Sequence, residues 1–289
     1  MNTGNSTTAE LPIGLFDSGV GGLTVLAALR KRLLQENYCY LGDTARLPYG
    51  TKSSGTIVRY ALQATEKLVE RRIKFLVVAC NTATAAALPE LRTAYAPLPV
   101  VGVVEPGARA ACAVISDKRG KEGKPGGGRI IVMATESTIR GAAYTKAIHA
   151  LEPEAEVIGV SCSLFVSLAE EGWMDGPIAE GITRRYLAPA LAPERPDCIV
   201  LGCTHFPPLA KAIAAVAGKD VALVDSAATT AEAVEQELKD RNLLRSSRQQ
   251  NTPGQIHFLT TDAPERFARV GSLFLGMEIN PDQLELVVL

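Results

Sequence analysis

The chain has 289 residues, of which 47% are hydrophobic and 21% charged, and its 30 basic and 31 acidic residues leave a formal charge of -1. This length suits one large or two medium domains, whereas the near-zero charge excludes a broad electrostatic surface for nucleic acid or an anionic membrane. No run reaches the roughly 18 to 20 apolar residues of a membrane span, and the N-terminal segment lacks the basic flank and apolar core of a signal sequence. We therefore expect a small-molecule partner and a cytoplasmic location.

Nine short apolar runs rich in β-branched residues are predicted to be strands. They are continuous rather than alternating, which is typical of strands covered on both faces, and longer helical patterns separate them. This order indicates an α/β protein whose parallel strands are joined by helical crossovers. The predicted strands are residues 13–16, 38–42, 75–79, 100–104, 129–133, 156–160, 198–202, 221–225 and 256–260.

Seven segments between these runs are predicted to be helices. Capping residues support several of their starts, such as Thr135 before one segment and Ser226 before the last. Two further segments, residues 117–128 and 245–255, are predicted to be surface loops. The first is rich in lysine and glycine, but it lacks the residue order of a phosphate-binding loop. The predicted helices are residues 22–34, 55–72, 83–94, 136–151, 176–190, 209–217 and 227–241.

A repeat organises the chain. A strand that leads into Cys80 and is followed by a helix is echoed, about one domain length later, by a strand that leads into Cys203 and is followed by a helix. The repeat predicts two similar α/β units that face each other across a cleft.

Cys80 and Cys203 are candidate functional thiols. A single cysteine at the end of a buried strand usually acts as a small hydrophobic side chain, and we interpret Cys112 and Cys198 in that way. In open parallel sheets, however, ligands bind beyond the carboxyl ends of the strands, where Cys80 and Cys203 lie. The cysteines are scattered and include no CxxC pair, so all are expected to be reduced.

Small polar residues follow each of these thiols. They are Asn81 and Thr82 in one unit, and Thr204 and His205 in the other. Their side chains and the first backbone N–H groups of the next helices could bind a carboxylate, because the helix dipole favours an anion there. Helix capping is the alternative for both threonines, and the two roles are compatible. His205 could also promote thiolate formation at Cys203 or supply a proton.

Two further polar turns follow predicted strands near the N-terminus. Asp17 and Ser18 precede a glycine-rich turn that only weakly matches a dinucleotide-binding fingerprint. The Asp17 carboxylate either caps this turn or orients a substrate ammonium group or a neighbouring proton-transfer residue. Beyond the second strand, Asp43 precedes a turn in which Tyr49 and Gly50 could close the cleft.

Two thiols that line one cleft fit a particular reaction. One thiolate removes a proton from a carbon atom, and the other thiol delivers a proton to the opposite face of the planar intermediate. This is racemisation without a cofactor, and a histidine or a helix dipole must activate the thiolate. A zinc site built from Asp17, Cys80, Cys203 and His205 is the alternative, but neither CxxC spacing nor a recognised catalytic zinc motif is present.

Six motifs, spread in order along almost the whole chain, carry a resemblance to a known family. They are "GLFDSGVGGLTVL" from Gly14, "LGDTARLPYG" from Leu41, "VVACNTATA" from Val77, "GVVEPG" from Gly102, "VLGCTHFP" from Val200 and "LVDSA" from Leu223. The chain resembles bacterial glutamate racemases, members of the aspartate/glutamate racemase superfamily. The resemblance implies interconversion of L- and D-glutamate without pyridoxal phosphate, metal or nucleotide, which provides D-glutamate for peptidoglycan synthesis.

The resemblance also implies a role for each residue that matches a motif. Cys80 and Cys203 are the two acid/base residues, with Cys80 deprotonating D-glutamate and Cys203 deprotonating L-glutamate. Asp17 and His205 assist proton transfer. The residues implied to surround the substrate are Asp17, Ser18, Tyr49, Gly50, Asn81, Thr82, Thr135, Thr204 and His205.

A further catalytic acid of the family matches Glu170, with Glu171 as the competing alignment; an exposed helix residue is the alternative for either. The chain departs from the family pattern nearby, where Ser163 and Ser167 replace common prolines and Ala134 replaces a glycine. These departures concern the local backbone rather than the reaction.

The resemblance implies two pseudo-symmetric, doubly wound α/β domains with the active site in the cleft between them. The first domain comprises residues 11–104 and 221–289, the second comprises residues 105–220, and residues 1–10 form a flexible extension. A homodimer is usual in the family; some members also bind DNA gyrase, a role that the near-neutral charge does not support. The alternatives are a racemase of a related substrate such as aspartate, and a non-catalytic amino-acid-binding regulator.

Overall fold

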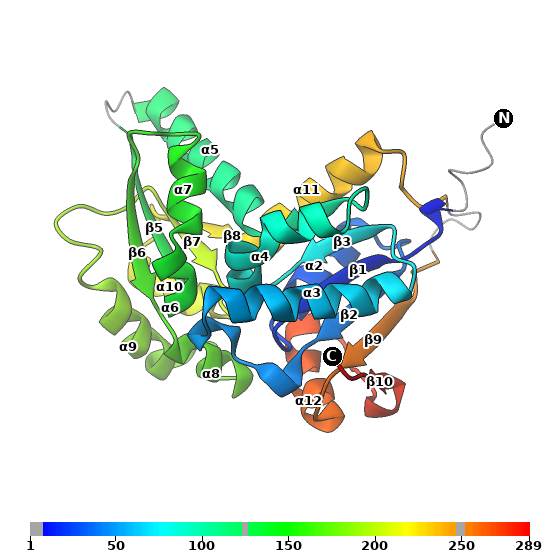
Figure 1. Cartoon of the computed structure of the whole chain (residues 1–289). Coiled ribbons are helices and arrows are strands. Elements are labelled where there is room, and N and C mark those ends of the chain that lie inside the picture. Colours follow the sequence, from blue (N-terminus) through cyan, green and yellow to red (C-terminus); the bar gives the residue numbers. More distant parts are fainter. Residues whose placement is uncertain (1–7, 123–126, 247–251) are drawn as a thin grey trace.

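The computed structural model describes residues 8–122, 127–246 and 252–289, and it contains two sheets with helices on both faces (Figure 1). The larger sheet has the strand order β10-β9-β2-β1-β3-β4 and the smaller has the order β6-β5-β7-β8. Every strand pair in both sheets is parallel. This confirms the predicted fold class. We call the six-stranded sheet with its helices the first unit, and the four-stranded sheet with its helices the second unit.

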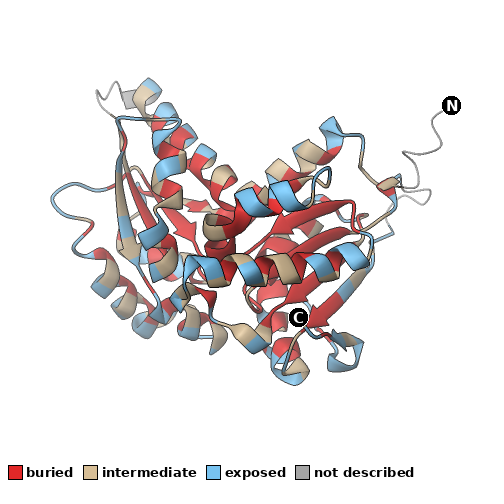
Figure 2. Cartoon of the chain, in the orientation of Figure 1, coloured by how far each residue is buried: buried red, intermediate tan, exposed pale blue. Residues whose placement is uncertain are grey.

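All nine predicted strands form, each within two residues of its predicted bounds. The central strands β1, β3 and β7 are buried along their whole length, as the continuous apolar runs indicated (Figure 2). The sequence prediction missed only the short, largely exposed edge strand β10 (Leu284–Leu286) among the described residues. The other strands are β1 (Ile13–Asp17), β2 (Tyr38–Gly42), β3 (Phe75–Val78), β4 (Val100–Gly102), β5 (Arg129–Ala134), β6 (Glu156–Ser161), β7 (Cys198–Gly202), β8 (Ala222–Asp225) and β9 (Ile256–Thr260).

Each predicted helical segment contains a helix, but the segment at residues 136–151 is broken at Ala142, whose φ of 53° is left-handed. Helices α5, α8 and α12 were not predicted. Among the described residues, no helix combines the length and apolar character needed to cross a bilayer. The helices are α2 (Leu23–Arg32), α3 (Ser54–Glu70), α4 (Asn81–Ala94), α5 (Val104–Glu122), α6 (Glu136–Gly141), α7 (Ala143–His149), α8 (Leu164–Glu170), α9 (Gly176–Leu187), α10 (Ala210–Ala217), α11 (Ser226–Asp240) and α12 (Pro264–Leu275).

The loop predicted at residues 117–128 is wrong for residues 117–122, which continue α5. Ala108, Ala111 and Ile115 lie at helical spacing and pack against the second sheet, so tertiary contacts extend the helix into a charged segment. Residues 123–126 lie outside the described residues.

Two other predicted segments fall partly outside the described residues. In the loop predicted at residues 245–255, residues 245–246 and 252–255 form neither helix nor strand, and residues 247–251 are not described. Residues 1–7 of the predicted flexible extension are likewise not described. Ala9, in contrast, is buried, and its carbonyl accepts a hydrogen bond from Lys74. The described end of the extension is therefore packed against the fold.

The second crossing between the units was predicted near Val221. Strand β8 pairs with β7 in the second sheet, and the chain leaves this sheet after Asp225. Helix α11 then packs against α2 of the first unit. At the first crossing, from the first unit to the second, α5 begins directly after β4 and packs against β7 and β8.

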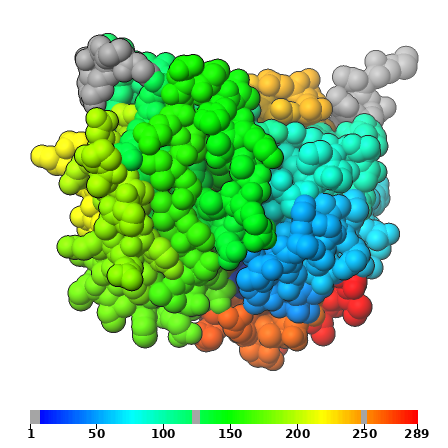
Figure 3. All heavy atoms as spheres, turned by 60° about the vertical axis from the view of Figure 1, so that its left-hand side comes forward, coloured from blue at the N-terminus to red at the C-terminus, as the bar shows by residue number. Residues whose placement is uncertain are grey.

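One apolar core continues from the first unit into the second. It includes Leu23 and Val77 on one side and Leu201 and Phe206 on the other. In the space-filling view, the blue and cyan surface of the first unit lies directly against the green surface of the second (Figure 3). The ends of β1, β3 and β7 therefore meet inside a packed interface.

A buried ion pair ties four segments of the first unit together. Lys74 Nζ lies 2.5 Å from Glu36 Oε2 and 2.6 Å from the carbonyl oxygen of Ala9. The other carboxylate oxygen, Glu36 Oε1, accepts a hydrogen bond of 2.8 Å from the backbone N–H of Arg245. Burial lowers the pKa of Lys74, and the Glu36 carboxylate opposes this effect.

Substituting Glu36→Gln is expected to lower the free energy of unfolding by about 3 kcal/mol, because the buried ammonium would lose its countercharge. Urea unfolding followed by circular dichroism measures this change. The matched control Glu285→Gln removes an exposed partner of Arg71 and His257 and should cost less than about 1 kcal/mol. Equal losses in the two variants would contradict the assignment.

Candidate active site

A cavity of about 190 Å³ lies between the two units, and residues from both units line it. Most of the residues predicted to surround a substrate are in its wall. Asp17 and Glu170 are not in the wall. The predicted residues in the wall are Ser18, Tyr49, Gly50, Cys80, Asn81, Thr82, Thr135, Cys203, Thr204 and His205. The lining residues that were not predicted as site residues are Pro48, Thr51, Ser163, Val166 and Ser167.

Cys80 lies between the end of β3 and the first turn of α4, which it caps. Its sulfur accepts a hydrogen bond of 3.4 Å from the backbone N–H of Ala83 and lies 3.7 Å from Ser18 Oγ. Burial, together with the nearby Asp17 carboxylate, raises the pKa of Cys80 to about 12. Cys80 is therefore a neutral thiol near pH 7 and can donate a proton.

Cys203 follows β7 and lies beside a buried histidine. The distance from Cys203 Sγ to His205 Nδ1 is 3.9 Å, and that from His205 Nε2 to Glu170 Oε1 is 3.1 Å. The other oxygen of Glu170 accepts a hydrogen bond of 2.6 Å from Arg266. Glu171 is exposed at the end of α8. Of the two candidate acids, Glu170 is the one that contacts His205.

The contacts of His205 keep its imidazole protonated. Burial alone lowers the pKa of His205, but hydrogen bonds to Cys203 and Glu170 outweigh it and raise the pKa to about 10. Burial alone also raises the pKa of Glu170, but the contacts with His205 and Arg266 lower it overall. Near neutral pH the pair is thus imidazolium and carboxylate, and the imidazolium lies beside the Cys203 sulfur.

Asp17 lies behind the cavity wall at the end of β1. Its Oδ2 atom accepts a hydrogen bond of 3.0 Å from the backbone N–H of Gly19, and its Oδ1 atom is buried without a hydrogen-bond partner among the described residues. Burial raises the pKa of Asp17, and the nearby His205 opposes that rise. Because the carboxylate also acts on Cys80, it links the electrostatics of the two thiol sites.

Comparison with known proteins agrees with this arrangement. The sequence model of the family described as Asp/Glu/Hydantoin racemase matches residues 24–234. A glutamate racemase from Geobacter metallireducens is 50% identical over 264 residues, which cover 91% of this chain and 92% of that protein. The chain belongs to the Asp/Glu/Hydantoin racemase family. Its expected class, an isomerase that acts on amino acids, is thereby confirmed.

Solved structures of glutamate racemases share the fold of this racemase. The enzyme from Francisella tularensis, in complex with D-glutamate, superimposes with a TM-score of 0.85 at 34% identity, over 97% of this chain and 98% of that chain. The enzyme from Thermus thermophilus, in complex with beta-chloro-D-alanine, gives a TM-score of 0.82 at 38% identity over the same shares.

Three threonine hydroxyls of the racemase form a cluster where α4 of the first unit meets α6 of the second. Thr82 Oγ1 lies 3.1 Å from Thr135 Oγ1 and 3.2 Å from Thr138 Oγ1, and the last two atoms are 3.1 Å apart. Thr82 and Thr135 were predicted, whereas Thr138 was missed because only the fold brings it to Thr82. The cluster joins the two units at the cavity.

Contacts with backbone groups join the units on the Cys203 side of the racemase. Thr24 Oγ1 lies 3.0 Å from the carbonyl oxygen of Thr204, to which it can donate. Gly21 approaches the same loop so closely that a Cβ atom would lie 2.4 Å from Thr204 Oγ1 and 2.5 Å from His205 Nδ1. The glycine-rich turn therefore serves close packing against His205, which the sequence alone did not indicate.

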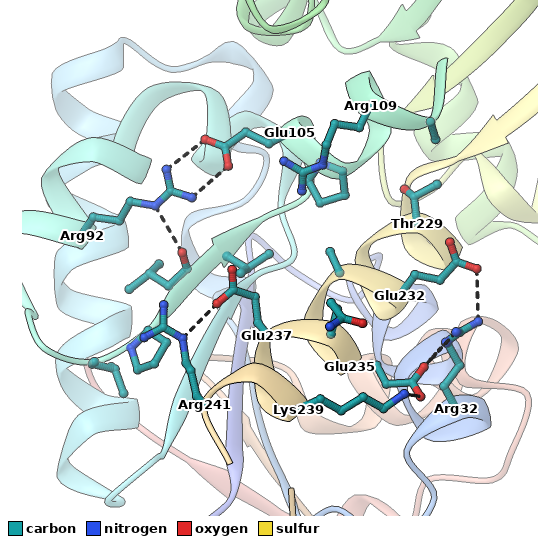
Figure 4. Close-up of a pocket in the computed structure, with 18 of the residues that line it drawn as sticks. Arg32, Arg92, Glu105, Arg109, Thr229, Glu232, Glu235, Glu237, Lys239 and Arg241 are labelled. Carbon is teal, nitrogen blue, oxygen red and sulfur yellow. Dashed lines mark hydrogen bonds and ion pairs between the residues drawn. The ribbon is translucent and has the colours of Figure 1, made fainter. Parts of the chain in front are cut away.

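A second cavity of the racemase, about 950 Å³ in volume, lies away from the thiols, where α4, α5 and α11 meet (Figure 4). Its charged side chains mostly pair with one another. Arg92 forms a bidentate ion pair with Glu105, and Arg32 contacts both Glu232 and Glu235. No residue of the predicted site lines this cavity, and its paired charges offer little to a charged ligand.

Substituting Gly21→Ala is expected to reduce racemase activity at least about tenfold, because the added methyl group must displace His205. The matched control is Gly19→Ala, whose Cβ atom would make an ordinary contact of 3.5 Å with Leu47. Steady-state rates of both purified variants test this, with circular dichroism to confirm that they fold. Equal activities would show that the close approach at His205 is not needed.

Proposed function

We propose that this racemase interconverts L- and D-glutamate by proton transfer at the α-carbon, with one thiol acting on each face. The observation that carries the proposal is that Cys80 and Cys203, one from each unit, line a single cavity. The names of the relatives and the D-glutamate bound to the Francisella tularensis enzyme support the substrate. The cavity volume of about 190 Å³ suits a small amino acid.

The charges around the two thiols suggest the order of events. A Cys203 thiolate, stabilised by the His205 imidazolium, takes the α-proton, and the electrons of the broken C–H bond pass into the substrate's carboxylate group. The planar intermediate then takes the proton of the neutral Cys80 thiol on its opposite face. Cys80 ends as a thiolate and Cys203 as a thiol, so the reverse sequence converts the other enantiomer. Every proton and electron pair is accounted for without a cofactor.

Groups near the two thiols would hold the substrate. The helix α4 begins at Asn81, directly after Cys80, and its N-terminal N–H groups favour an anion. On the other side, Thr204 and His205 present polar groups to the same cavity. We propose that these residues bind the carboxylates, while Asp17 acts through His205 and Cys80 rather than by direct contact.

The cellular role belongs to the same proposal. D-Glutamate would supply peptidoglycan synthesis, and the enzyme would work in the cytoplasm as a homodimer. All six cysteines are free, and a reducing compartment would keep the two cavity thiols unpaired. Light scattering during size-exclusion chromatography tests the dimer.

The replacements Cys80→Ser and Cys203→Ser are each expected to reduce racemisation at least about 10³-fold in both directions, because each direction needs both an acid and a base. The assay follows D-glutamate formation from L-glutamate with no added cofactor. In deuterated water, the product of the unmodified enzyme should carry deuterium at its α-carbon. The matched control Cys112→Ser changes a thiol on α5, outside the cavity, and should leave the rate unchanged.

These measurements also separate the rival functions. Deuterium exchange with aspartate but not with glutamate would assign aspartate as the substrate. The two amino acids differ by one methylene group, which can decide which of them fits the cavity. A glutamate-binding regulator would keep its ligand response in both serine variants and would show no turnover. Dependence of the rate on pyridoxal phosphate would overturn the two-thiol mechanism.

The pH profile tests the role of Glu170. The His205 imidazolium persists up to its raised pKa of about 10, so kcat/KM should fall above that pH. The variant Glu170→Gln removes a contact that raises this pKa, and the alkaline limb should therefore move down by roughly one pH unit. The variant Glu171→Gln changes an exposed neighbour and should leave the limb in place. If the alkaline fall of kcat/KM occurs at the same pH in Glu170→Gln as in the unmodified enzyme, Glu170 has no role in the mechanism.

A further inference from the structure

The side-chain amide of Asn81 is held at one end and unpaired at the other. Asn81 lines the cavity next to Cys80 and is almost fully buried. Its Oδ1 atom accepts a hydrogen bond of 2.7 Å from the hydroxyl of Tyr144. Its Nδ2 atom is buried and has no hydrogen-bond partner among the described residues. A buried amide nitrogen without a partner is costly unless a ligand supplies an acceptor.

In the structure, the hydrogen bond from Tyr144 to Oδ1 leaves the nitrogen end of the amide for a ligand. An asparagine amide can rotate by half a turn, which exchanges its oxygen and nitrogen, and only its hydrogen bonds distinguish the two orientations. Because the hydroxyl donates to Oδ1, both N–H groups of Nδ2 stay available. A carboxylate, which only accepts hydrogen bonds, requires that orientation.

Tyr144 is itself fixed in place. Its ring is buried and packs against Gly107 and Gly202. A Cβ atom added at Gly107 would lie 3.1 Å from the nearest ring carbon, and one added at Gly202 would lie 3.0 Å from another ring carbon. It belongs to α7 of the second unit, whereas Asn81 begins α4 of the first. The hydrogen bond therefore forms only when the two units are together.

We propose that Tyr144 is a positioning residue of this racemase: its hydroxyl fixes the amide of Asn81 so that both N–H groups of Nδ2 face the cavity and bind a carboxylate of the substrate. The inference rests on the proposed function, because it assigns Asn81 a ligand of that reaction. Neither the sequence motifs nor the composition of the cavity wall indicates Tyr144, which lies one layer behind the wall.

The test is a double-mutant cycle on the full-length enzyme with Tyr144→Phe, Asn81→Ala and the double variant. Tyr144→Phe should raise KM about tenfold for both glutamate enantiomers, because the amide is no longer held for a charged acceptor. The fall in kcat/KM must be equal in the two directions, since the equilibrium constant between mirror images is one. In the Asn81→Ala background, Tyr144→Phe should have no further effect on KM.

Calorimetric titration of glutamate gives a second readout that does not depend on turnover, and it should show the same loss of affinity in Tyr144→Phe. An unchanged KM with a reduced kcat would indicate a merely structural role and overturn the inference. Independent effects of the two replacements would do the same. If the unmodified enzyme binds but does not racemise glutamate, the proposed function fails, while the calorimetric comparison still decides the role of Tyr144.

A second variant covers the case in which Tyr144→Phe does not fold. Gly107→Ala retains the hydroxyl, but its Cβ atom would lie 3.1 Å from a ring carbon and 3.3 Å from the hydroxyl oxygen of Tyr144, so this side chain must shift by a few tenths of an ångström. It should raise KM in the same direction, and the rise should again vanish in the Asn81→Ala background. A rise that persists without the amide would contradict the inference.

Discussion

The hydrogen bond between His205 and Glu170 keeps both of these groups charged on the Cys203 side of the site. Either group, buried alone, would lose its charge, because an apolar surrounding disfavours ions that have no partner. Paired at 3.1 Å, both keep it. The first unit helps to cover the pair: Arg266 of α12 contacts the carboxylate, and the ring of Phe274 packs edge-on against the imidazole, with 5.2 Å between the ring centroids. The chemistry of the second unit thus depends on its packing against the first.

The repeated strand, thiol and helix produce two unequal environments. Cys80 leads directly into α4, whereas Cys203 is followed by the 3-10 turn Pro207–Leu209 before α10 begins. One thiol is kept neutral by burial and a carboxylate, and the other lies beside a cation. On the proposed mechanism, a repeated backbone plan with different neighbours supplies an acid and a base at the same time.

Local sequence signals predicted the strands well, because strands that are buried on both faces must be apolar throughout. The signals failed for α5, where Pro106, Gly120 and several charges hide a helix that tertiary packing stabilises. Helix α12 carried a usable signal, since Phe267, Val270 and Phe274 lie at helical spacing on its buried face. Motif resemblance indicated most of the cavity wall. Thr24, Thr138 and Tyr144 could not be predicted, because their partners lie far away along the chain and meet them only across the two units.

The high pKa of the Cys80 thiol has a kinetic consequence on the proposed mechanism. A turnover that begins at Cys203 leaves Cys80 as a thiolate, the less favourable form of the free enzyme. A molecule of the opposite hand restores the starting state by reacting in reverse; without one, the protein must exchange protons with water before it can act again. When one enantiomer is in large excess, this return step sets the upper limit on the rate. In a racemic mixture, the opposite enantiomer returns the proton to Cys80 and restores the starting form of the enzyme. The protonation state of the free enzyme therefore records which enantiomer was converted last.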